Sequence, residues 1–182
     1  MVQYVTKSEL RNIAAQSTII EQAQIRKSLT LDSTTTSTFL SHSSKDDDLV
    51  VGAIKVLRNH GANVYIDEVD PSMPPYTTEE TAELLKSRIQ HSKRFVLLAS
   101  ANSKESRWVP WELGIADGYK GTRGIALFPA VDSQSEDWAS WEYLGLYRKI
   151  VWGEIRGRQG SLWMVLDTKR NTGTPLRDWL TG

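Results

Sequence analysis

Four short apolar runs constrain the fold of this 182-residue chain more than any other feature. Apolar runs of this length, bounded by polar turn residues, are typical of buried strands. We predict strands close to residues 37–41, 62–67, 94–100 and 124–130. Between the first three runs, apolar residues recur at helical spacing in two stripes, Leu49, Val50, Ala53, Ile54, Leu57 and Ala82, Leu85, Ile89. This alternation predicts an α/β domain with a parallel sheet and helices on both faces.

Composition excludes several classes of function. Lysine plus arginine and aspartate plus glutamate both number 22, so no net charge favours nucleic acid or an anionic membrane as partner. The chain has no cysteine, which excludes a thiolate nucleophile and a disulfide framework. Its three histidines are scattered, so we expect no metal centre. The chain lacks a secretory apolar region and a run of membrane-spanning length, so we expect a cytoplasmic protein.

The first 36 residues differ from the rest of the chain, and we predict a boundary after them. Residues 7–28 have the thin apolar face of a helix that docks on the domain or on a partner. A Ser/Thr-rich stretch follows and is typical of a linker. The expected organisation is therefore a helical extension with its linker over 1–36 and a main domain with a C-terminal extension over 37–182.

Several local signals predict where elements begin and end. Asp46 can cap the first helix of the domain, and Gly61 can end it. Thr77 and Glu80 have the spacing of a capping box, after a stiff loop at 68–76 that holds three prolines. Near the C-terminus we expect an edge strand over 147–152 and a short helix over 174–180, capped by Thr174.

The segment after the third strand carries the strongest functional signal. We expect residues 100–106 to form a turn and Ser106 to cap the helix that follows. Trp108 and Glu112 are four residues apart and share one face of that helix, at the carboxyl end of a strand. Ligands bind at such ends in open α/β sheets. A second interpretation is structural: the glutamate pairs with Arg107 or complements the helix dipole, and the tryptophan packs.

The order of these motifs resembles the TIR (Toll/interleukin receptor) domain family. The resemblance covers about residues 37–152 and includes the proline-bearing loop after the second strand. Its other motifs are Phe39-Leu40-Ser41-His42-Ser43-Ser44-Lys45-Asp46, Val64-Tyr65-Ile66-Asp67, Ser106-Arg107-Trp108-Val109-Pro110-Trp111-Glu112-Leu113-Gly114 and Glu142-Tyr143-Leu144-Gly145-Leu146-Tyr147. It implies a flavodoxin-like TIR fold, with a central parallel sheet of about five strands.

In catalytic members, the resemblance also implies cleavage of the nicotinamide–ribose bond of NAD+. By position, Glu112 matches the family's catalytic glutamate and Trp108 the aromatic residue before it. The substrate-binding positions that match are Ser41, His42, Ser43, Ser44 and, at the lip of the cleft with loop 68–76, Asp67. Catalytic animal members carry arginines just after the first strand, where this chain has two serines. Phosphate contacts would then come from backbone N–H groups, hydroxyls or Lys45.

The chemistry needs few groups. Nicotinamide leaves from a cationic pyridinium, so no general acid is required, and one carboxylate beside the ribose can stabilise the developing oxocarbenium ion. NAD+ would be a substrate, and no further cofactor is expected. Trp108 could stack on the base or exclude water from the site.

Two main functions remain open at this point. The first is an NAD+-consuming enzyme that makes linear, cyclic or base-exchanged ADP-ribose, which in a stand-alone bacterial member suggests antiphage defence through a separate effector. We also expect such an enzyme to self-associate. The second is a non-catalytic TIR module that assembles signalling complexes. A nucleoside-processing transferase is a weaker third possibility.

Overall fold

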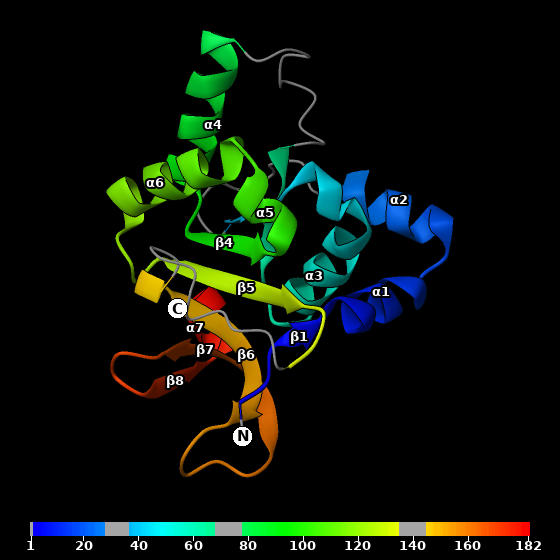
Figure 1. The fold of residues 1–182 in the computed structure, drawn as a ribbon, viewed down its shortest axis with the longest axis vertical. Coiled ribbons are helices and arrows are strands. Elements are labelled where there is room, and N and C mark those ends of the chain that lie inside the picture. Colours follow the sequence, from blue (N-terminus) through cyan, green and yellow to red (C-terminus); the bar gives the residue numbers. More distant parts are fainter. Residues whose placement is uncertain (1, 28–36, 68–77, 135–144) are drawn as a thin grey trace.

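The computed structural model describes residues 2–27, 37–67, 78–134 and 145–182, which fold around one mixed sheet (Figure 1). Five of its strands run parallel in the order β3-β2-β4-β5-β6. These strands are β2 (Ser37–Ser41), β3 (Asn63–Tyr65), β4 (Arg94–Ala99), β5 (Ile125–Val131) and β6 (Arg148–Glu154). The strand order reverses at β2, as it does in flavodoxin-like sheets. The predicted fold class is therefore confirmed, with the third predicted strand inside the sheet.

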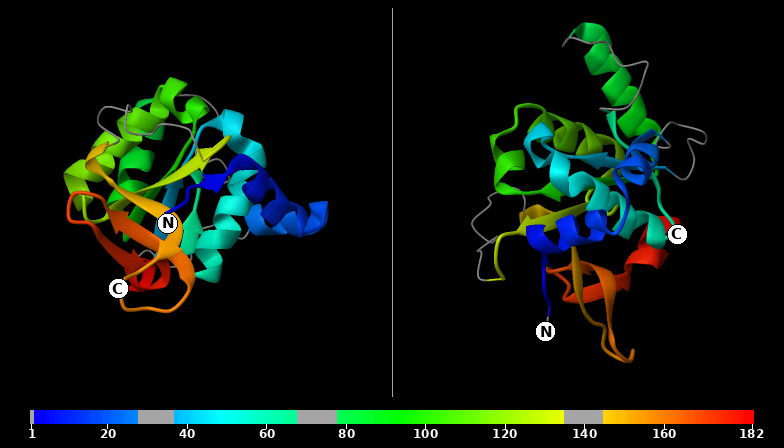
Figure 2. Two further views of the ribbon diagram at one scale, coloured as in Figure 1. Left: turned by 60° about the horizontal axis from the view of Figure 1, so that its bottom comes forward. Right: turned by 90° about the vertical axis from the view of Figure 1, so that its right-hand side faces the viewer.

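Helices cover both faces of this sheet (Figures 1 and 2). One face packs against α1 (Lys7–Ala15), α3 (Asp47–Asn59) and α7 (Leu176–Thr181), and the other against α4 (Glu79–His91) and α6 (Trp108–Lys120). The predicted stripe of α3 is buried along its whole length. That helix ends before Gly61, whose φ of +90° places it in the left-handed region that a glycine adopts without strain. Among the described residues, no helix is both long and apolar enough to cross a membrane.

Four predicted features at helix starts are wrong in detail. Ser106 is not the N-cap of α6, because Arg107 takes that position, although the Ser106 hydroxyl accepts a 3.4 Å hydrogen bond from Val109 N. Residues 100–106 are not a plain turn, because Ala101–Glu105 form the short helix α5, which Ser100 caps. Helix α4 is capped by Thr78 rather than Thr77, since the Thr78 hydroxyl accepts a hydrogen bond from the backbone N–H of Thr81. Asp46 precedes α3 but its carboxylate makes no capping bond, because it is bonded elsewhere. These errors share a cause: several polar residues stood next to each helix start, and local rules could not choose between them.

The C-terminal part of the sheet is larger than predicted. Strand β6 is not an edge, because the antiparallel strands β7 (Ser161–Asp167) and β8 (Thr172–Pro175) extend the sheet beyond it. These strands were missed because they are only partly buried, so their apolar signal is weak. The terminal helix α7 begins at Leu176, with Pro175 rather than Thr174 in the capping position.

The N-terminal residues also join the domain. Strand β1 (Val5–Thr6) pairs in parallel with β5, and α1 packs on α3, where Leu10 is fully buried. The two helices approach closely because Gly52 lies under Leu10, whose carbonyl a Cβ at Gly52 would meet. The predicted docking of the first helix on the domain is thus confirmed. The predicted helix is divided, however, since α2 (Ile19–Lys27) starts anew after Thr18, whose hydroxyl accepts from Glu21 N.

Some predicted segments fall outside the described residues. These are the Ser/Thr-rich linker over most of its length, the proline-bearing loop 68–76 and most of the polar segment after β5. In the described part, α4 and the β6–β7 hairpin lie toward opposite ends of the molecule's long axis (Figures 1 and 2).

Candidate active site

Glu112 is buried at the carboxyl end of the parallel strands. Its side chain comes from α6, and the Ser41 hydroxyl at the end of β2 donates a 2.5 Å hydrogen bond to Glu112 Oε2. Glu112 is 4% exposed and Ser41 is fully buried. Glu112 is therefore not an exposed helix charge. The predicted pairing with Arg107 is wrong, because Arg107 is exposed at the start of the helix and is not its partner.

The sheet register explains why these two residues meet. Ser41 lies opposite Leu97 of β4, and Leu97 lies opposite Leu127 of β5. Side chains of one cross-strand row point to the same face of a sheet, and both leucines belong to the core beneath α4 and α6. The Ser41 hydroxyl therefore points toward α6. A one-residue slip of β2 would turn it to the α3 face.

The environment of Glu112 favours its neutral form. Burial raises the pKa of Glu112 to about 8, and the negative charge of Asp67 contributes to the rise. The hydrogen bond from Ser41 acts in the opposite direction, because it favours the carboxylate. Asp67 is half-buried and lies two residues after the end of β3. At neutral pH the side chain of Glu112 is thus mostly protonated, and no positive charge from the described residues contributes to its pKa.

Trp108 lies one helical turn before Glu112. It is half-buried and meets the ring of Trp111 edge to face, with the ring centroids 5.1 Å apart. Both rings pack against the core beneath α4 and α6. The packing predicted by the structural interpretation is present, and it fixes the orientation of an aromatic ring that stays partly accessible.

The loop after β2 supplies the other predicted residues. His42 is half-buried next to Ser41. Ser43 is buried and caps a short 3-10 helix, Ser44–Asp46, by accepting a 3.3 Å hydrogen bond from Lys45 N. Ser44 is exposed on that helix. The structure therefore gathers Ser41 and Glu112 within the electrostatic reach of Asp67. The binding roles of this loop remain predictions.

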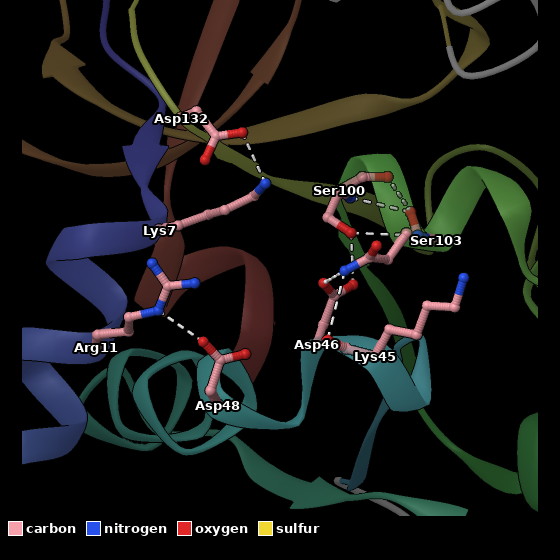
Figure 3. A network of polar contacts seen from close by, with 9 residues as sticks. Lys7, Arg11, Lys45, Asp46, Asp48, Ser100, Ser103 and Asp132 are labelled. Atoms are coloured by element: carbon pink, nitrogen blue, oxygen red, sulfur yellow. Dashed lines mark hydrogen bonds and ion pairs between the residues drawn. The ribbon is translucent and has the colours of Figure 1, made fainter.

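Asp46 is a site residue that sequence reasoning treated only as a cap (Figure 3). It is 1% exposed, and its carboxylate accepts hydrogen bonds from Ser100 Oγ at 2.5 Å and from Asn102 Nδ2 at 2.7 Å. On the surface, Lys45 and Glu105 form an ion pair of 3.2 Å between the same two segments. These contacts tie the loop after β2 to the start of α5.

The sequence did contain a signal for this network. Polar residues follow both β2 and β4, which are neighbouring parallel strands. Because the carboxyl ends of such strands lie at the same edge of a sheet, the residues after β2 could have been expected to contact those after β4. The network holds the loop that begins at Ser41. In the described part of the chain, no three His, Cys, Asp or Glu side chains are grouped so that they could hold a metal ion.

Comparison with known proteins agrees with this geometry. The family model described as the TIR domain matches residues 38–160. The chain belongs to the TIR domain family. A protein of Bacillus cereus (strain MSX-D12) with the provisional name 3′ cyclic ADP-D-ribose synthase ThsB′ is 34% identical over 146 residues, which are 78% of this chain and 74% of that protein. A Cytobacillus dafuensis protein provisionally named cyclic ADP-D-ribose synthase TIR2 is 36% identical over 93 residues, covering 50% of this chain but only 24% of its own length.

Proposed function

We propose that this TIR protein cleaves the nicotinamide–ribose bond of NAD+ and that Glu112 is its catalytic residue. The observation that carries the proposal is the buried pair of Ser41 and Glu112 at the carboxyl end of the sheet. An isolated carboxyl in a dry site costs stability, and such groups are concentrated at functional sites. The names of the two bacterial relatives support the same class of reaction.

The raised pKa of Glu112 fits a substrate that carries a positive charge. In the free protein, burial and Asp67 keep the carboxyl mostly protonated at pH 7. A nicotinamide cation beside it would lower its pKa again, because an opposite charge favours the ionised form. Binding of NAD+ then releases a proton and leaves a carboxylate next to the ribose. The Ser41 hydroxyl holds one oxygen of that carboxylate in place.

The bond then breaks without a general acid. Its electron pair goes to the ring nitrogen, nicotinamide leaves as a neutral molecule, and the positive charge moves to the ribosyl oxocarbenium ion. The Glu112 carboxylate stabilises that ion in a site from which water is largely excluded. Capture by water gives ADP-ribose and one proton, whereas capture by a nucleophilic atom of the same molecule gives a cyclic product. We favour the cyclic product, which both relatives' names describe.

The remaining predicted residues have subsidiary roles in this proposal. Trp108 walls the base side of the site, His42 and Asp67 line its entrance, and the hydroxyls of Ser43 and Ser44 reach the diphosphate. Lys45 also lies on this loop, where its ion pair with Glu105 leaves it exposed enough to meet a phosphate. No other cofactor is needed for these steps.

We further propose that the nucleotide product acts on a separate effector in bacterial antiphage defence in the cytoplasm, and that the enzyme works as an assembly. Ile19 and Ile20 of α2 are 86% and 71% exposed and offer an apolar contact. The specific rate should therefore fall as the enzyme is diluted. A rate per chain that stays constant down to the monomeric range contradicts this part of the proposal.

The decisive experiment is incubation of the purified chain with NAD+, followed by chromatography for nicotinamide and ADP-ribose species. Glu112→Gln should lower nicotinamide release by about two to three orders of magnitude, the usual effect of removing one preorganised stabilising group. Asp117→Asn, a matched change on the exposed side of the same helix, should not change it. If Glu112→Gln releases nicotinamide at the wild-type rate, Glu112 is not the catalytic residue. If none of the three proteins releases nicotinamide, the result favours a non-catalytic TIR module.

A further inference from the structure

A second, basic pocket lies at the opposite end of the sheet from Glu112. It has a volume of about 140 Å³ and is formed by the residues before β5, the start of β6 and the turn between β7 and β8. Its polar lining consists of Thr122, Arg123, Arg148, Asp167, Thr168, Lys169 and Arg170. Figure 1 shows the starts of β5 and β6 on the left, whereas both α5 and the carboxyl end of β5 lie to the right. The pocket is therefore separate from the proposed NAD+ site.

Positive charge predominates in this pocket. Four cationic side chains face one carboxylate, that of Asp167. Asp167 forms a 3.4 Å ion pair with Arg148 and accepts a 3.2 Å hydrogen bond from Arg170 N. Within the described part of the chain, Arg123 and Lys169 have no carboxylate within ion-pair distance. The single carboxylate of Asp167 therefore leaves most of the positive charge of this pocket uncompensated.

The cations behind the pocket support this conclusion. Burial lowers the pKa of Arg94 on β4, and the positive charge of Arg148 lowers it further. Burial likewise lowers the pKa of Lys120 to about 8, with a contribution from Arg94. Both side chains are held by backbone carbonyls, Arg94 by that of Trp179 and Lys120 by that of Ser92. Neutral carbonyls do not cancel the positive charge of these two side chains. This end of the sheet therefore has an excess of positive charge, which a bound anion would neutralise.

Pocket size and donor type define the anion. Guanidinium groups match phosphate oxygens with two parallel N–H bonds, and two threonine hydroxyls add donors that carry no charge. The volume is well below the roughly 300–1,000 Å³ of sites that enclose a whole drug-sized ligand. A dinucleotide such as NAD+ therefore does not fit inside it, whereas one phosphate group does.

We propose that this pocket binds the phosphate monoester group of a small metabolite, such as a nucleoside monophosphate. Arg123, Lys169 and Arg148 provide the charge, and Thr122 and Thr168 provide the neutral donors. The rest of the ligand lies outside the pocket, over the exposed turn between β7 and β8.

Titration of the full chain with AMP, inorganic phosphate and adenosine tests the proposal, read by calorimetry and by ¹⁵N NMR. We expect saturable binding of AMP and of phosphate but not of adenosine, with shifts at the amides of residues 122–124 and 167–170. If AMP binds but inorganic phosphate does not, the base rather than the phosphate group is recognised, which contradicts the proposal. Shifts confined to residues 41–46 would place the ligand in the Glu112 site and overturn it as well.

A pair of double variants separates a built site from general attraction. Arg123→Gln with Lys169→Gln removes two exposed cations of the pocket and should weaken phosphate binding at least about tenfold, because charge-assisted hydrogen bonds are lost. The matched control, Arg156→Gln with Arg158→Gln in the exposed turn between β6 and β7, removes the same charge elsewhere. Equal weakening in both double variants would show that only the net charge matters and would refute the proposal.

Discussion

Replacing Glu112 by glutamine should make the protein more stable at alkaline pH, even as activity is lost. The wild-type carboxyl is 4% exposed and has a pKa of about 8, whereas the ordinary value is 4.5. Between these two pH values the folded chain keeps a proton that the unfolded chain has released. Stability conferred by this group is therefore present below about pH 4.5 and is lost as the pH rises to about 8.

The size of the effect follows from the same two values. Each pH unit in this window costs the folded state about 1.4 kcal/mol, so the upper bound is about 5 kcal/mol. Relaxation of the site reduces this bound, and we expect a few kcal/mol. Glutamine has nearly the same shape, can still accept the Ser41 hydrogen bond and does not titrate. In a domain of this size, one kcal/mol corresponds to about 2–4 °C in Tm.

Thermal unfolding of the wild type, Glu112→Gln and Asp117→Asn from pH 5 to pH 9 measures this linkage. The Tm of Glu112→Gln minus that of the wild type should grow with pH up to about pH 8 and then level off at about 5–10 °C. The control variant should follow the wild type, because its side chain is exposed on the same helix. If the difference between Glu112→Gln and the wild type is independent of pH, then Glu112 does not hold a raised pKa, and the electrostatic argument for the site fails.

Three further changes test neighbouring parts of the site. Ser41→Ala removes the hydrogen bond that favours the Glu112 carboxylate. We expect kcat/KM to fall about tenfold at pH 7, and the pH at which kcat/KM rises to become higher, because Glu112 ionises less readily. A pH profile of kcat/KM that does not shift would contradict this. Trp108→Ala should raise KM as well as lower kcat if the ring contacts substrate, whereas an effect on Tm alone would indicate packing only. Asp46→Ala leaves Ser100 and Asn102 without their buried partner and should cost about 1–3 kcal/mol in urea unfolding; a cost below about 0.5 kcal/mol would mean that the network does not hold the loop.

The fold was more predictable from the sequence than the site was. Buried parallel strands and the apolar stripe of α3 produce strong periodic patterns, so the order of elements could be read directly. Strands β7 and β8 lie at a half-exposed edge, where alternation is weak, and they were missed. The pairing of Ser41 with Glu112, 71 residues apart, depends on sheet register and on how α6 packs. Local sequence rules also predicted only a capping role for Asp46. Its actual partners, Ser100 and Asn102, follow a different strand and are distant in the sequence.

The close packing of α1 over Gly52 has a consequence for anyone who builds chimeras from this family. The family match begins at residue 38 and ends at residue 160, yet Leu10, Leu176 and Trp179 lie outside it and are buried in the same core as α3. A graft of the matched segment alone would carry Gly52 without the helix that packs on it, and an uncovered sheet face, into its new host. The matched segment is therefore not a portable unit, and exchange of whole TIR chains should succeed where exchange at those boundaries yields aggregates.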